Sequence, residues 1–261
     1  MPAEFWTLLF LVGLGVGFCS GLLGIGGGIL LVPALLYVPP LFGVPPMDMR
    51  VIAGLTMAQG FVASWSGILG HRRDRHVCRR LVWHMGPAML VGSAAGGLLS
   101  ARVPSRALLL MFAALALVAA VLMLLPRAEA DGPADPDAVA YPVPLAIVVP
   151  VLLGGFLGMV GQGGAFILIP FMLYVLRVPT RVALGSSLGI IMFSAAAGLA
   201  GKLLTGQVAF VPAMALLSGS VLGGGAGGLC SGRVPARALR YALACIIGGT
   251  ALRMWSEVLF G

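Results

Sequence analysis

The chain has 261 residues, 60% of them hydrophobic, with a mean hydropathy of +1.07 and only 16 Lys and Arg and 8 Asp and Glu residues. Soluble domains carry about 25% charged residues, so the 9% found here excludes an ordinary soluble protein. In so apolar a chain, the net charge of +8 indicates membrane topology and contact with anionic lipid rather than binding of nucleic acid.

Uncharged stretches divide the chain into membrane segments. They cover residues 5–47, 51–70, 81–101, 107–126, 138–176, 182–201 and 203–232. Most reach the roughly 20 residues that a spanning helix needs. The segment from Arg237 to Phe260 adds a last span whose charged side chains can extend to the interface. The sequence therefore predicts an all-α polytopic membrane protein with about eight transmembrane segments.

The acidic residues lie only at segment ends or in loops, so no carboxylate is expected deep in the membrane. Cation carriers and proton pumps usually need such a carboxylate, and its absence favours an anionic or neutral cargo. The four cysteines have no paired spacing typical of a metal site or a disulfide framework. We therefore predict neither a metal nor a cofactor.

An internal repeat organises the sequence. Residues 17–37 align with residues 154–174 at a constant offset of 137, and the segment GGLLSARVPSRAL from Gly96 matches GGLCSGRVPARAL from Gly227 at an offset of 131. The sequence thus predicts two homologous halves, residues 1–125 and 142–261. The joint at 126–141 is rich in Pro, Ala and acids, as flexible surface linkers are.

Each half opens with a glycine-rich segment that must interrupt a helix. A straight helix over residues 5–47 would be about 65 Å long, against a hydrocarbon core of roughly 30 Å. We place the break at Gly24 to Gly28, followed by Pro33, and its counterpart at Gly161 to Ala165. A helix that restarts there directs free backbone N–H groups into the membrane interior, which would form an anion site.

The paired segments GLLGIGGGILLVP and GMVGQGGAFILIP resemble the sulfite exporter TauE/SafE family of bacterial membrane permeases, and the resemblance covers nearly the whole chain. It implies movement of sulfite, sulfonates or related organosulfur anions across the bacterial inner membrane. It does not fix the anion, the direction, the coupling ion or the oligomeric state.

The distribution of basic residues favours inverted halves. If each broken segment crosses an even number of times or re-enters, eleven Lys and Arg lie inside and five outside, whereas parallel halves place eight on each side. Because basic residues concentrate on the cytoplasmic side, we predict inversion, with both termini periplasmic and the two breaks facing each other near the midplane. Whether the broken segments span or re-enter stays open.

The candidate substrate-binding residues lie at the two breaks and at the starts of the helices that follow: Gly26, Gly27, Gly28, Gly163, Gly164, Gln162, Thr56, Ser186 and Ser187. Gln162 replaces Ile25 of the first half, and its amide can either bind an anion oxygen or cap loop carbonyls. For the three hydroxyls we favour bonds within or between helices over cargo binding. Glycines that break no overlong segment, such as Gly13, Gly15 and Gly223, are predicted to serve helix packing, with a mild effect for Gly223→Ala.

Three further residues are candidates for gating or proton coupling. His71 and Lys202 occupy equivalent repeat positions at the ends of spans, where we favour extension of the side chain to the interface over recruitment of an anion. His84 lies well within its span and could carry a proton with the anion, although a neutral, hydrogen-bonded histidine near the interface is the favoured interpretation.

We predict a secondary carrier that exports sulfite or an organosulfonate by alternating access. H⁺ is a possible coupling ion, and the partners are the small anion and the lipid bilayer, with no nucleic acid. The alternatives are an anion channel, a carrier of another cargo and, least favoured, an intramembrane enzyme. An enzyme would need paired carboxylates, or a serine with an intramembrane base, and the sequence indicates neither.

Overall fold

The computed structural model describes residues 3–23, 28–70, 77–124, 139–162, 165–230, 248–249 and 252–256. Within these residues every regular element is helical. The helices are α1 (Ala3–Leu23), α2 (Gly28–Leu41), α3 (Met49–Gly70), α4 (Arg79–Leu99), α5 (Ser105–Leu124), α6 (Val143–Val160), α7 (Ala165–Pro170), α8 (Thr180–Leu204) and α9 (Phe210–Cys230), with a 3-10 turn, η1 (Ser100–Arg102), and a π-helical turn, η3 (Phe171–Val175).

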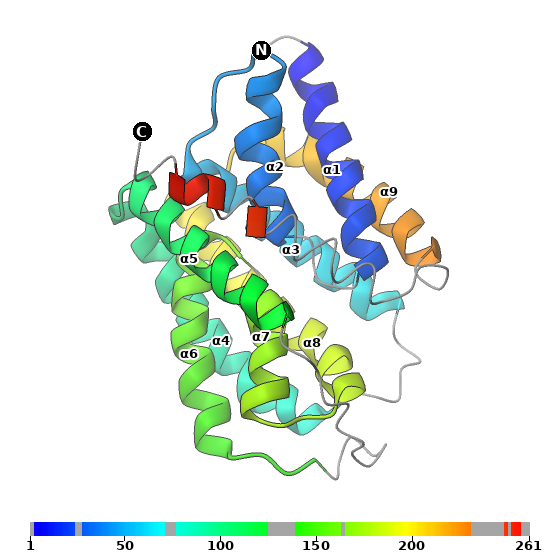
Figure 1. Ribbon diagram of the computed structural model, residues 1–261, viewed down its shortest axis with the longest axis vertical. Helices are drawn as coiled ribbons and strands as arrows, with labels where there is room; N and C mark the ends of the chain where they lie inside the picture. Colours follow the sequence, from blue (N-terminus) through cyan, green and yellow to red (C-terminus); the bar gives the residue numbers. More distant parts are fainter. Residues whose placement is uncertain are drawn as a thin grey trace.

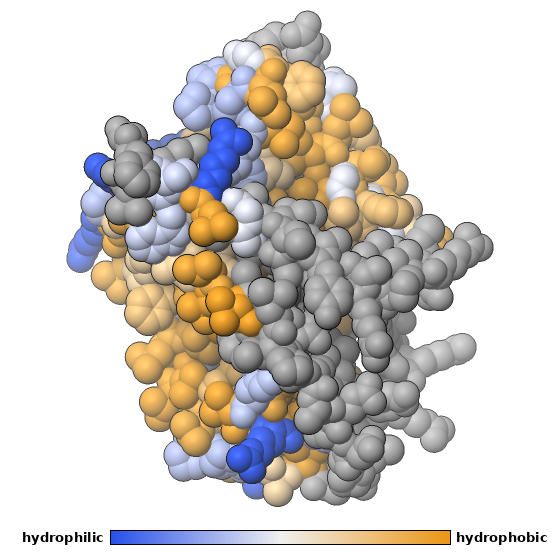
Figure 2. All heavy atoms as spheres, in the orientation of Figure 1, coloured by the Kyte–Doolittle hydropathy of each residue, from blue (hydrophilic) through white to orange (hydrophobic). Residues whose placement is uncertain are grey.

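Three stretches of the described helices are long and apolar enough to cross a membrane, namely Val143–Val160, Gly185–Leu204 and Phe210–Gly227. Shorter apolar helices cover Phe5–Ser20, Gly28–Leu41 and Ser105–Val118. Many large apolar side chains face outward, including Leu204, Phe210 and Met214. Figure 2 shows apolar side chains over much of the described surface on one face. An exterior of this kind suits lipid contact.

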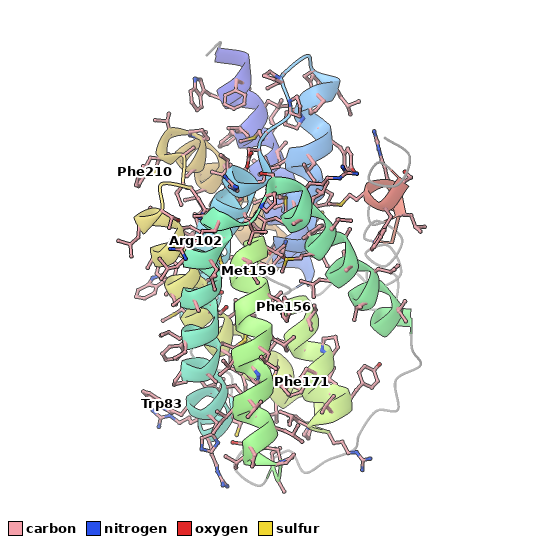
Figure 3. The ribbon with its side chains drawn as sticks, turned by 90° about the vertical axis from the view of Figure 1, so that its left-hand side faces the viewer. Trp83, Arg102, Phe156, Met159, Phe171 and Phe210 are labelled. Carbon is pink, nitrogen blue, oxygen red and sulfur yellow. The ribbon has the colours of Figure 1, made fainter. Side chains whose placement is uncertain are left out.

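The helices form two lobes along the long axis of the molecule. Figures 1 and 3 place α1, α2 and α9 toward one end and α4, α6, α7 and α8 toward the other. Buried apolar residues such as Leu31, Ile52, Phe112 and Leu168 belong to one continuous core. The lobes therefore meet across apolar packing, with α3 and α5 near the middle (Figure 1).

Two helix pairs approach closely through glycines. In the α1–α9 pair, Gly17 lies against the backbone of Ser220, and in the α4–α6 pair, Gly154 lies against the backbone of Met89. These contacts correspond under the sequence offsets of 137 and 131, since Gly17 matches Gly154 and Met89 matches Ser220. Helix α1 of the first half thus packs against α9 of the second half, and α6 of the second half packs against α4 of the first.

The contacts also give the relative directions of the helices. Gly92 lies against Val151 and Gly96 against Gly155, so α4 and α6 run parallel. Residue numbers fall along α8 as they rise along α3, because Gly198 contacts Met57 whereas Gln207, just beyond α8, contacts Gly54. Helices α3 and α8 are therefore antiparallel.

The described parts of the helices stop on either side of both predicted breaks, whose residues 24–27 and 163–164 lie outside the described residues. Helix α1 ends at Leu23 and α2 begins at Gly28, while α6 ends at Val160 and α7 begins at Ala165. The two restarted helices differ, however. Helix α2 continues through Pro33 for 14 residues, whereas α7 has only six residues and passes into the π-helical turn after Pro170. The two restarted helices therefore differ in length and in regularity.

The glycine predictions need two corrections. Gly13 and Gly223 do serve packing, but a Cβ on Gly223 would meet the backbone carbonyl of Leu14, which makes the predicted mild effect of Gly223→Ala wrong. A Cβ on Gly15 meets nothing within 4 Å among the described residues, so Gly15 packs against none of the described helices. Most of the predicted linker at 126–141 and of the last span from Arg237 lies outside the described residues.

Candidate functional site

The two broken segments are joined by the side chain of Gln162. Its Nε2 donates a hydrogen bond of 2.9 Å to the carbonyl oxygen of Gly28, the first residue of α2. Gln162 is 1% exposed. A Cβ on Gly28 would lie 2.8 Å from Gln162 Oε1 and 3.2 Å from Thr56 Cγ2, so a larger residue would collide with the amide. Residues from both breaks and from α3 thus converge at one buried point, here called the junction: Gly28, Thr56 and Gln162.

Local backbone geometry places Gln162 at this point. Helix α6 ends at Gly161, whose φ of 84° lies in the left-handed region, and the N–H groups of Gly161 and Gln162 both donate to the carbonyl of Leu157. This arrangement is typical of glycine-capped helix ends. Gly161 also lies directly against the backbone of Ala53 on α3, where a side chain would not fit. The glycine therefore lets Gln162 leave the helix and cross to the other half.

Lys202 lies in a buried polar cluster. Its Nζ donates to Ser100 Oγ at 3.0 Å, to the carbonyl of Met159 at 3.2 Å and to Gln207 Oε1 at 3.3 Å. The side chain is 0% exposed, so the expectation that it extends to the interface is wrong. The three oxygens can accept all three N–H groups of a protonated amine, in place of the water that it would otherwise keep. Its partners come from η1, α6 and the α8–α9 loop.

The oxygens that bind Lys202 are all neutral. In the described part of the chain the only carboxylates are Glu4 and Asp48, and Asp48 bonds Ser105 and the backbone of Arg50 in an exposed position. Asp48 is not among the residues bonded to Lys202. A buried charge without an opposite charge beside it is costly and attracts anions.

The lysine cluster lies close to the junction. Met159, which accepts from Lys202, precedes Gln162 by three residues, and Figure 3 places it near the middle of the long axis. The backbone of Gln207 lies against Gly54, which precedes Thr56 by two residues on α3. This turn of α3 therefore contacts the lysine cluster on one side and the junction on the other.

The predicted hydroxyl residues differ in position. Thr56 lies at the junction, but its Oγ1 donates to the carbonyl of Ile52 in its own helix at 2.8 Å. Ser186 Oγ accepts from the N–H of Cys78, 3.0 Å away, at the start of α4, so it ties α8 to α4 rather than meeting the junction. Ser187 is buried on α8. Thr56 thus bonds within its own helix and Ser186 bonds between helices, which are the kinds of bond that we favoured for these hydroxyls from the sequence.

His84 lies near the N-terminal end of α4, whereas Lys202 of α8 bonds Ser100, just beyond the C-terminal end of α4. Its Nδ1 is 3.0 Å from the hydroxyl oxygen of Tyr141, and the guanidinium of Arg80 lies 5.9 Å from the Tyr141 ring centre. Burial, together with the neighbouring Cys78, raises the pKa of Tyr141, and Arg80 opposes this rise. Tyr141 is therefore a protonated phenol at neutral pH, and His84 is part of a half-buried hydrogen-bonded pair.

Five of the predicted site residues lie outside the described residues: Gly26, Gly27, Gly163, Gly164 and His71. Conversely, the sequence interpretation missed three polar residues near the junction, namely Ser100, Gln207 and Gln59. A signal for Gln59 was present. It is a polar residue within the uncharged stretch 51–70, and its counterpart in the other half is Ile190.

Comparison with known proteins identifies the family. The sulfite exporter TauE/SafE family matches residues 9–254 of the chain. The chain belongs to this family. No solved structure matches it.

Relatives of this TauE/SafE chain are named as transporters. A protein of Xylella fastidiosa, named a probable membrane transporter protein, is 30% identical over 238 residues, which cover 88% of this chain and 87% of the relative. One of Bacillus subtilis with a similar name is 25% identical over 238 residues, covering 84% and 86%. One of Methanocaldococcus jannaschii is 27% identical over 192 residues, covering 74% and 70%. Together with the apolar helices, these likenesses make the chain a multi-pass membrane transporter protein.

Proposed function

We propose that this protein is a secondary carrier of small anions, with export of sulfite or a small organosulfonate across the bacterial inner membrane as the leading case. The observation that carries the proposal is Lys202, a fully buried cation bonded to three neutral oxygens beside the junction of the two breaks. Among the described residues no carboxylate compensates this charge. An anion at the junction would do so.

The packing supports alternating access between inverted halves. Helices α3 and α8, which correspond in the repeat, run antiparallel. The α1–α9 contact is equivalent to the α6–α4 contact, because α1 corresponds to α6 and α9 to α4 in the repeat. Carriers built from inverted repeats bind cargo where discontinuous helices meet. The bond from Gln162 to Gly28 joins two such discontinuities, which makes the junction the proposed cargo site.

The family name narrows the cargo to sulfur oxyanions, and the junction fits their chemistry. Gly28, the first described residue of α2, lies between Gln162 and Thr56, and in the proposed site N–H groups of this part of α2 donate to the anion oxygens. H⁺ is the proposed coupling ion, with His71 and His84 as its candidate carriers. The bond from His84 to Tyr141 makes a structural role the stronger interpretation for His84.

Transport into proteoliposomes tests this function. Purified protein should catalyse saturable flux of at least one anion from a panel of sulfite, sulfate, thiosulfate, taurine and sulfoacetate, and a preset pH gradient should change the rate if H⁺ is coupled. Anion flux without saturation would instead support the channel alternative. Flux of cations alone would contradict the anion site.

A further inference from the structure

Gln59 is a buried amide without a hydrogen-bond partner. It lies on α3 with 1% of its surface exposed, and both Nε2 and Oε1 are buried and unbonded in the part of the chain that the structure describes. Buried polar groups are nearly always bonded, because an unmet donor or acceptor loses its water without replacement. Ser64 and Ser194 have similar unbonded hydroxyls, but Gln59 leaves two donor hydrogens and an acceptor unmet.

The position of Gln59 relates it to the junction. It follows Thr56 by three residues on α3, and residues with this spacing lie on the same helix face. Long helical side chains lean toward the N-terminus of their helix, which for Gln59 is the turn that carries Thr56. The Thr56 methyl in turn lies beside Gly28, where the N-terminal turn of α2 is buried. Gln59 therefore lies on the face of α3 that carries Thr56, next to the first described turn of α2.

The two glutamines near the junction have different bonds. Gln162 already donates an N–H to the carbonyl of Gly28, so it connects the two breaks. Gln59 has both N–H groups free. The repeat partner of Gln59, Ile190, is fully buried on α8, which shows that an apolar side chain can fill the corresponding position. An unbonded amide at position 59 is thus not required by the helix packing of the repeat.

We infer that Gln59 is a cargo-binding residue, whose amide donates hydrogen bonds to an oxygen of an anion held at the first turn of α2 beside Thr56. This inference rests on the proposed function, since it names a ligand of the same site. A neutral amide binds the oxyanion by donation alone, and the positive charge of nearby Lys202 provides the attraction. The ligand is an oxyanion such as sulfite or the sulfonate group of an organosulfonate.

The test compares Gln59→Met with wild type, using thermal unfolding of the purified full-length protein in detergent. Sodium sulfite, sodium methanesulfonate and sodium chloride are compared at matched ionic strength. At least one oxyanion should raise the Tm of wild type, and Gln59→Met should weaken its apparent affinity about tenfold or more. Without anion, Gln59→Met should unfold at the wild-type temperature or above it, because methionine removes the unbonded amide at similar volume.

Ile190→Met is the matched control, because it changes the repeat-related buried position and should leave anion affinity unchanged. Wild-type affinity in Gln59→Met would overturn the inference while leaving the anion site standing. A lower Tm or loss of folded Gln59→Met would show that the amide supports the fold and would overturn the inference as well. If no oxyanion stabilised wild type, the proposed function itself would fail.

Discussion

The two halves of the molecule are alike in helix packing and unlike in polar chemistry. The α1–α9 and α4–α6 pairs use glycines at equivalent positions, as Gly17 and Gly154 illustrate. At the centre, by contrast, each half has one glutamine where the other has isoleucine: Gln59 corresponds to Ile190, and Gln162 to Ile25. The repeat therefore specifies a nearly symmetric scaffold, whereas the polar groups that meet the junction are asymmetric. A site of this kind would be assembled once, from both halves.

The largest effect on stability is expected from replacing glycines at the equivalent α1–α9 and α4–α6 contacts by alanine. Gly223→Ala and Gly92→Ala each place a methyl group against a backbone carbonyl, of Leu14 and Val151 respectively, which side-chain motion cannot relieve. Overpacking of this kind typically costs about 1–3 kcal/mol. Both variants should lower the Tm and the yield of folded protein. Gly15→Ala, with nothing within 4 Å of the new Cβ, should behave as wild type. Tolerance of the change in only one pair would show that the two contacts are not energetically equivalent.

The second effect tests the charge at the asymmetric centre. Lys202→Met removes the cation, and Ser100 Oγ and Gln207 Oε1, which are 3.0 Å apart, can still bond each other. The fold should therefore survive, since replacing a buried charge by an apolar group is often neutral or stabilising. Anion transport in proteoliposomes should fall at least about tenfold, as expected for loss of a charged interaction of 1.4 kcal/mol or more.

Lys202→Arg is the control that keeps the charge while changing the shape of the donor group. It should retain more transport than Lys202→Met. Equal transport by Lys202→Met and wild type would remove Lys202 from the anion site and leave it as a structural connection between η1, α6 and the α8–α9 loop.

The scaffold could be predicted from sequence further than the site could. The breaks at Gly24–Gly28 and Gly161–Ala165 were predicted from segment length and glycine content, which are local properties. The end of α6 at Gly161 agrees with the second break, whereas residues 24–27 of the first lie outside the described residues. Burial of Lys202 was not predictable in this way. Its position near the end of an uncharged stretch suggested the interface, but its acceptors Ser100 and Met159 are distant in sequence and become neighbours only when the helices pack. The sequence marked Gln59 as a polar residue in an uncharged stretch, but it could not show that the amide has no hydrogen-bond partner, which depends on helix packing.

The third prediction tests whether the scaffold is inverted across the membrane. Helices α3 and α8 are antiparallel, so the segments that follow them should emerge on opposite sides. Single cysteines near Arg75 and near Thr205, in a background without the four native cysteines, should react with an impermeant thiol reagent from opposite faces of the membrane. Labelling of both from the same face would contradict inverted halves, whatever the cargo.

The smallest effect is expected on anion stabilisation, compared between a variant of Gln162 at the junction and a variant of His84 near the N-terminal end of α4. Gln162→Leu removes the bond to the Gly28 carbonyl and leaves that oxygen buried without its partner, at a cost of about 1–3 kcal/mol. If the anion lies at the junction, the variant should reduce anion stabilisation in thermal unfolding by several-fold. His84→Leu breaks a half-buried bond to Tyr141 and should leave anion stabilisation nearly unchanged, because water can replace the lost partner there. The opposite result, a stronger loss of anion stabilisation in His84→Leu than in Gln162→Leu, would place the anion near the N-terminal end of α4. His84, rather than the two glutamines, would then be the candidate for cargo or proton binding.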